Sequence, residues 1–162
     1  MTKLDELLPL NGRCTCSKVK YQLLNKPLFV HCCHCTWCQR ETGASFALNA
    51  FIETHNVKLL QGKTETIYTP TSSTGGQKII RCASCKIALW SHYSGAGDVI
   101  SLVRIGTLDD SNALQPDIHI YTSTQQHWLK LSDEIPKVEE YYQKKDYWPA
   151  ESIERFDRLT GK

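Results

Sequence analysis

The cysteines constrain this chain more than any other feature of its sequence. Eight of its 162 residues are cysteines. They form a first pair (Cys14 and Cys16), a central group (Cys32, Cys33, Cys35 and Cys38) and a last pair (Cys82 and Cys85). Thiolates are soft ligands, and short loops with C-x-C and C-x-x-C spacing can wrap around one tetrahedral Zn²⁺ ion. Eight such ligands are enough for two metal sites.

A disulfide framework is the competing interpretation of the same cysteines. Eight cysteines in 162 residues are fewer than a small secreted scaffold of this length would carry. The N-terminal residues lack the apolar segment of about 7–15 residues that a secretory signal requires. In an intracellular chain, paired cysteines favour metal binding. We therefore expect a cytoplasmic protein whose cysteines bind metal.

Charge and hydropathy argue against two classes of partner. Nineteen basic and seventeen acidic residues give a net charge of +2, and no long block of one sign occurs. A nucleic-acid site would need a clustered basic face, so no nucleic-acid partner is expected. No apolar run approaches the roughly 18 residues of a membrane span, and the length fits one domain.

Short apolar segments separated by glycine and proline predict a mainly β domain. Val19, Tyr21 and Leu23 alternate with polar residues, as in a half-buried strand. A helical turn is expected before Gly43, and a short helix over residues 153–159. Further strands are expected at 28–31, 44–52, 57–60, 65–68, 77–81, 87–92, 99–105 and 118–122, with a hairpin turn at 74–76.

These elements suggest three parts along the chain. Residues 1–11 are expected to form an N-terminal arm, 12–136 a zinc-binding β domain, and 137–162 a C-terminal extension with a short helix. The segment 128–131 is expected to be a packed loop. Three tryptophans are interpreted as core or interface aromatics, namely Trp90, Trp128 and Trp148.

The cysteine spacing allows two ways of sharing ligands between two ions. In a zinc-ribbon arrangement, the last pair joins Cys35 and Cys38, and the first pair joins Cys32 and Cys33. Both sites are then closed, and the protein is a zinc-stabilised binding module without catalysis. In the second arrangement, the first and last pairs form one closed site, and Cys33, Cys35 and Cys38 are left with three thiolates. Closing so long a loop removes about 3.5–4 kcal/mol of unfolded-state entropy. Spacing alone does not choose between them.

The motifs around the cysteines resemble those of the glutathione-dependent formaldehyde-activating enzyme family, which includes the centromere protein V relatives. The matching residues are G-x-C-x-C-x-x-V-x-Y from Gly12 to Tyr21, C-H-C-x-x-C-x-R-x-x-G-A from Cys33 to Ala44, the last pair, and a tail with His119-Ile120-Tyr121, Trp128 and Asp133-x-Ile135-Pro136. The likeness therefore runs from about residue 12 to residue 136. The family usually has glycine after each knuckle, where this chain has Ser17 and Lys86.

The resemblance implies the second arrangement and a mixed β "tent" of short antiparallel strands, stapled by zinc and flanked by short helices. It implies two zinc ions per chain, a structural one on the first and last pairs and a catalytic one on Cys33, Cys35 and Cys38. The implied activity is that of a zinc-dependent carbon–sulfur lyase. Its substrate would be an adduct of glutathione or another small thiol, such as S-hydroxymethylglutathione.

The residues around an open three-thiolate site suggest further roles. A catalytic zinc needs a free position, and a thiol that fills it is deprotonated. Arg40 is the candidate partner for a glutathione carboxylate. Cys32 alternates with Cys33 along a strand and is expected to face the core. His34 is expected to point away from the three cysteines, the alternative being that it fills the fourth position. Trp37 is expected to pack, the alternative being that it lines the substrate pocket. The other five histidines are expected to be structural or surface residues.

Overall fold

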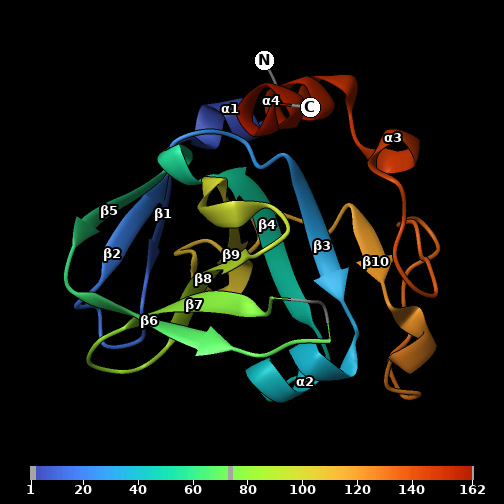
Figure 1. The fold of residues 1–162 in the computed structure, drawn as a ribbon, viewed down its shortest axis with the longest axis horizontal. Helices are drawn as coiled ribbons and strands as arrows, with labels where there is room; N and C mark the ends of the chain where they lie inside the picture. Colours follow the sequence, from blue (N-terminus) through green and yellow to red (C-terminus); the bar gives the residue numbers. More distant parts are fainter. Residues whose placement is uncertain (1–2, 73–74, 162) are drawn as a thin grey trace.

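Figure 1 shows the computed structural model, which describes residues 3–72 and 75–161. Within those ranges, ten strands form two sheets and the helices are short. This confirms the predicted mainly β fold. The small sheet has the order β1–β2–β5, and the large sheet has the order β10–β3–β4–β9–β8–β7–β6.

The strands of the small sheet are β1 (Leu10–Arg13), β2 (Lys20–Leu23) and β5 (Val57–Gln61). The large sheet contains β3 (Phe29–Cys33), β4 (Ala47–Glu53), β6 (Thr64–Thr69), β7 (Gln77–Cys82), β8 (Ala88–Tyr93), β9 (Ile100–Arg104) and β10 (Ile118–Ile120). The α-helices are α1 (Lys3–Leu7), α2 (Thr36–Thr42), α3 (Lys144–Tyr147) and α4 (Ala150–Thr160). Short 3₁₀ turns occur at 54–56, 97–99, 105–107 and 122–124.

The expected strands are present, with ends shifted by a few residues, but β1 was not expected. Its residues alternate between buried and exposed, with Leu10 and Gly12 inside. The alternation is hard to detect in the sequence, because glycine does not count as an apolar residue. Gly12 lies opposite Tyr21 on β2, and a Cβ at Gly12 would lie 2.3 Å from the Tyr21 ring. The spacing between these two motif residues therefore reflects a cross-strand contact that only glycine permits. β6 and β7 pair as expected for a hairpin. Residue 74 of the predicted hairpin turn lies outside the described residues.

β3 is the strand that positions the central group of cysteines. It is antiparallel to β4 and parallel to β10, which makes the large sheet mixed. All five of its residues are buried. In the parallel pair, His119 lies beside Cys32 and Ile120 beside Cys33. The end of β3 is therefore enclosed on both sides, and α2 follows it directly.

The helices lie at opposite ends of the molecule (Figure 1): α1 and α4 are together at one end, and α2 is at the other. The expected C-terminal helix is present as α4, whose Arg155 forms an ion pair with Glu53 of β4 at 2.7 Å. Trp148, before α4, stacks on Phe29 with ring centroids 5.5 Å apart. No helix within the described residues is long and apolar enough to cross a membrane.

The prediction that residues 128–131 form a packed loop is wrong for Trp128, which is also not part of the core. Its side chain is 70% exposed, whereas Trp90 and Trp148 are buried. The indole N–H donates to Gln126 Oε1 at 2.9 Å. This contact is local, because Gln126 is only two residues away along the chain.

Candidate metal centres

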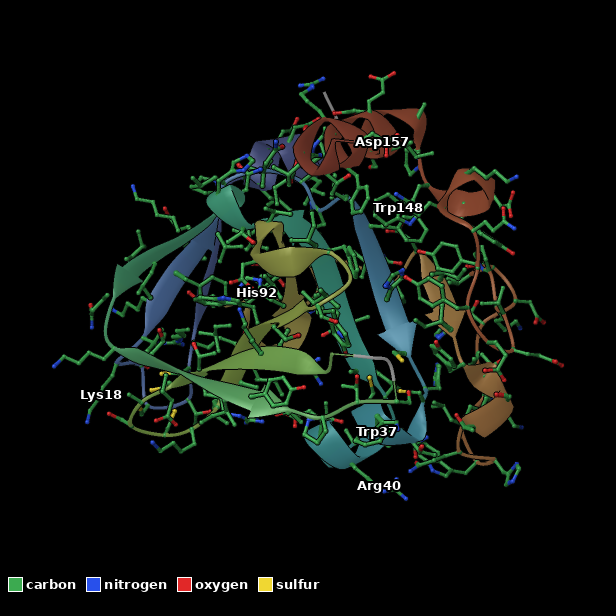
Figure 2. The ribbon with its side chains drawn as sticks, in the orientation of Figure 1. Lys18, Trp37, Arg40, His92, Trp148 and Asp157 are labelled. Carbon is green, nitrogen blue, oxygen red and sulfur yellow. The ribbon has the colours of Figure 1, made fainter. Side chains whose placement is uncertain are left out.

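The cysteine sulfurs gather in two regions of the molecule, one beside Lys18 and one above α2 (Figure 2). All eight cysteines are free thiols. Two sets have sulfurs that all lie within 4.8 Å of one another. The four-cysteine cluster consists of Cys14, Cys16, Cys82 and Cys85, and the three-cysteine cluster consists of Cys33, Cys35 and Cys38. The structure therefore does not contain the zinc-ribbon arrangement, which would place the last pair beside Cys35 and Cys38.

The four-cysteine cluster joins the two sheets. The first pair follows β1 of the small sheet. In the last pair, Cys82 ends β7 of the large sheet and Cys85 lies in the turn between β7 and β8. The Sγ atoms of Cys14 and Cys16 are 3.5 Å apart, and those of Cys16 and Cys82 are 3.8 Å apart. Four sulfurs at about 2.3 Å from a tetrahedral zinc lie about 3.8 Å from one another. The cluster therefore fits a zinc ion and has a donor for each of the four positions.

Backbone N–H groups stabilise thiolates in this cluster. The N–H of Val19 points to Cys14 Sγ at 3.3 Å, and that of Ser84 points to Cys82 Sγ at 3.4 Å. The backbone N–H of Cys85 lowers the pKa of Cys82. Those of Cys16 and Ile87 lower the pKa of Cys85 to about 6. Because the thiolate is the metal-binding form, these turns prepare the sulfurs for a cation.

The two knuckle positions that differ from the family's usual glycine have a conformation that favours glycine. Ser17 has φ 60° and Lys86 has φ 64°, both in the left-handed region. Each residue closes its turn by donating its N–H to a cysteine carbonyl, Cys14 O at 2.9 Å and Cys82 O at 3.0 Å. A residue with a Cβ pays roughly 1–2 kcal/mol in this conformation. Serine and lysine at these two positions therefore cost stability relative to glycine, while both turns still close.

The three-cysteine cluster forms where β3 passes into α2. Cys33 is the last residue of β3, and Cys35 is the N-cap of α2 and accepts a hydrogen bond from the Cys38 N–H at 3.3 Å. Cys38 is the buried residue of this helix. Hydrogen bonds from Cys33 and Cys38 lower the pKa of Cys35, which favours the thiolate form at this sulfur. No further His, Cys, Asp or Glu of the described chain joins this set.

One edge of the three-cysteine cluster is accessible. Cys33 and Cys38 are 6% and 8% exposed, whereas Cys35 is half-buried. Trp37, which was expected to pack, is 38% exposed beside it. Arg40 is exposed on the outer side of α2 in Figure 2, because two residues along a helix turn its side chain away from that of Cys38. The structure therefore does not bring Arg40 together with the three cysteines.

The charge of the three-cysteine cluster acts on three tyrosines that have no counterpart among the predicted site residues. They are Tyr93 at the end of β8, Tyr121 after β10 and Tyr141 in the C-terminal segment. Desolvation raises the pKa of all three, that of Tyr141 to about 12 although this residue is 51% exposed, and the charge of the cysteines adds to this effect. Their hydroxyls therefore stay protonated and can donate hydrogen bonds. Only Tyr121, in the His119-Ile120-Tyr121 motif, carried a signal in the sequence.

A third set of donors comprises Cys32, His34 and His119, whose donor atoms also lie within 4.8 Å of one another. All three side chains are buried. The prediction that His34 points away from the three-cysteine cluster is confirmed, but Cys32 and His119 form a polar cluster with it. Burial lowers the pKa of His34 to about 4, and the charge of His119 adds to this decrease. Burial also lowers the pKa of His119. Both imidazoles are therefore neutral at neutral pH.

Comparison with known proteins gives one family. A sequence model of the family described as glutathione-dependent formaldehyde-activating enzyme matches residues 9–124, which include every cysteine. Among solved structures, a crystal structure of a Rhodobacter sphaeroides protein is similar, with 20% sequence identity and a TM-score of 0.48. The similarity covers 66% of this chain and 92% of that chain. No curated protein matches.

Proposed function

This chain belongs to the glutathione-dependent formaldehyde-activating enzyme family, and from that premise we propose that it is a carbon–sulfur lyase whose site is the three-cysteine cluster. The proposed reaction joins glutathione and formaldehyde as S-hydroxymethylglutathione, or cleaves that adduct. The observation that carries this assignment is the difference in donor number: four cysteines complete one cluster, and three form the other. The family range covers both clusters.

The donor sets support zinc at both clusters, two ions per chain. The four-cysteine cluster would hold a structural ion, since all four tetrahedral positions have a protein donor. Cys33, Cys35 and Cys38 would hold the other. When bound there, that ion supplies a free Lewis-acidic position at which a thiol is held as its thiolate.

The chain's own residues define how substrates approach. Glutathione enters on the side of Cys35 and Trp37, because the other two sulfurs are buried. Its sulfur forms a bond to the formaldehyde carbon, the π electrons of the carbonyl move to oxygen, and the thiol proton ends on that oxygen. Tyr121 and Tyr141, with ring centroids 6.2 Å apart, are the protonated donors that we assign to this oxygen. Removing one such hydrogen bond typically costs about 10²–10³ in rate.

Recognition of the rest of glutathione is assigned more peripherally. Arg40 is exposed on the outer side of α2, so we assign it only to a carboxylate far from the reacting sulfur. We also propose a cytoplasmic location, because a reducing compartment keeps eight free thiols available for metal.

Exchange NMR with ¹³C-formaldehyde and glutathione tests the proposed reaction. The zinc-loaded protein should speed exchange between hydrated formaldehyde and the adduct, and Cys35→Ala should abolish that gain. Free Zn²⁺ at the same concentration and Arg13→Gln, an exposed change beside β1, serve as controls. Binding of glutathione without faster exchange would leave a glutathione-binding protein and remove the lyase assignment.

A further inference from the structure

β3 presents metal-binding side chains on both of its faces. Successive residues of a strand point to opposite sides, so Cys33 and Cys32 lie on different faces. The ladder continues past the end of β3, since the N–H of His34 donates to Ile120 O on β10 at 3.0 Å. Cys32 and His34 therefore share the face opposite the three-cysteine cluster.

The third donor on this face comes from the neighbouring strand. The parallel register places His119 of β10 beside Cys32 of β3, and paired residues of adjacent strands project to the same side of a sheet. The side chains of Cys32, His34 and His119 are 2%, 0% and 7% exposed. Three metal-binding groups from two strands thus converge in the interior.

Hydrogen bonds among these three side chains do not satisfy all of their polar atoms. His34 Nε2 lies 2.9 Å from His119 Nδ1 and 3.6 Å from Cys32 Sγ. A neutral imidazole nitrogen offers either one proton or one lone pair, so His34 Nε2 pairs with His119 or with Cys32, not with both. In either tautomer the buried His34 Nδ1 also has no partner among the described residues. A cation bound by Cys32 Sγ, His34 Nε2 and His119 Nδ1 would engage these three atoms at once.

The distances fit such a cation. With Zn–S at about 2.3 Å and Zn–N at about 2.0–2.1 Å, tetrahedral geometry places sulfur and nitrogen about 3.6 Å apart and two nitrogens about 3.3 Å apart. The first value is the distance between Cys32 Sγ and His34 Nε2, and the second requires the two rings to separate by about 0.4 Å. Besides burial, the positive charge of Lys137 lowers the pKa of His119. Lys137 is itself paired with Asp133 at 2.5 Å.

We propose that Cys32, His34 and His119 form a third metal site that binds Zn²⁺ through one thiolate and two imidazoles. The thiol proton of Cys32 leaves to solvent when the ion binds. The three protein donors leave the fourth tetrahedral position to a non-protein ligand. Because this site and the three-cysteine cluster take alternate residues of one strand, an ion here also fixes the backbone that carries Cys33.

Zinc content of full-length variants tests the site. Zn²⁺ alone is added to the chain, excess is removed by dialysis, and zinc per chain is measured by elemental analysis. His119→Gln and Cys32→Ala should each bind one Zn²⁺ fewer than the wild type. His92→Gln is the matched control, since His92 is another buried histidine that contacts Ile100 O at 2.8 Å and belongs to none of the donor sets. Unchanged zinc content in folded His119→Gln and Cys32→Ala would overturn the proposal.

A measurement on the unaltered protein guards against misfolded variants. In ¹⁵N NMR of histidine ring nitrogens, added Zn²⁺ should move the resonances of His34 Nε2 and His119 Nδ1 together. The ring nitrogens of His92 should not move. Invariant resonances of His34 and His119, at zinc levels that fill the other clusters, would overturn the site. This result is independent of lyase activity.

Discussion

The two cysteine clusters present the same kind of donor atom but join very different segments of the chain. In the four-cysteine cluster, Cys16 and Cys82 are 66 residues apart and come from different sheets. In the three-cysteine cluster, all donors lie between Cys33 and Cys38 at one strand end. Loop closure makes the first arrangement a staple, whereas the second restrains almost no chain. The difference teaches that a cluster's contribution to folding depends on which segments it joins.

The clusters also differ in completeness. A tetrahedral ion would find a protein donor for each position in the four-cysteine cluster, whereas in the three-cysteine cluster one position would be left to an outside ligand. The predictions below are arranged to break this contrast, beginning with the largest expected effect.

Opening the staple should have the greatest consequence. Cys82→Ser should remove the link between the sheets, with a loss of about 3.5–4 kcal/mol in loop closure alone and metal-binding energy in addition. A domain of this size has about 5–15 kcal/mol of stability in total. Circular dichroism with urea should therefore show a chain that is mostly unfolded or far less stable. A native-like transition midpoint would contradict the role of staple.

Opening the local cluster should spare the fold. Cys35→Ser removes a sulfur donor, but serine is itself a good N-cap, so α2 should lose less than about 1 kcal/mol. The same urea titration should show a near-native midpoint, while adduct exchange is lost. If Cys35→Ser destabilises the chain as much as Cys82→Ser does, the contrast between the clusters is wrong.

The contact between the two regions should have an intermediate effect. Arg81, beside Cys82, forms an ion pair with Glu41 of α2, and the two side chains are only 23% and 14% exposed. Arg81→Gln should cost about 1–2 kcal/mol, between the values for exposed and buried pairs, and should weaken glutathione binding a few-fold. The matched control is Lys78→Gln, whose pair with Asp98 is exposed and should contribute under about 1 kcal/mol. Equal effects of the two changes would argue against coupling through α2.

The smallest effect should be a gain. Ser17→Gly relieves a left-handed residue next to the four-cysteine cluster and should raise stability by about 1 kcal/mol. Glutathione affinity should not change, because the residue lies in the staple and not in the open cluster. Thermal unfolding and calorimetry check the two halves of this prediction, and a loss of stability would contradict the strain argument.

Sequence reasoning found the candidate metal-binding cysteines and much of the fold because both depend on local patterns. The alternation of Val19, Tyr21 and Leu23 predicted β2, and all three are fully buried. The pairing of the cysteines, by contrast, is set by which strand ends meet, and spacing left two arrangements open. β10 pairs in parallel with β3 only in the folded chain, so no spacing placed His119 beside Cys32. The exposure of Trp128 likewise depends on which residues pack around it in the folded chain, and an apolar residue type alone does not give this.

The central claim is that one cluster is complete and the other accepts an external thiol. The most direct test is ¹¹³Cd NMR of the cadmium-substituted protein during titration with glutathione, with Cys35→Ser used to identify the resonance of the three-cysteine cluster. We predict that glutathione shifts this resonance and leaves that of the four-cysteine cluster in place, whereas S-methylglutathione, which cannot supply a thiolate, shifts neither. A resonance of the three-cysteine cluster that does not respond to glutathione, or a response of both clusters, would contradict the account.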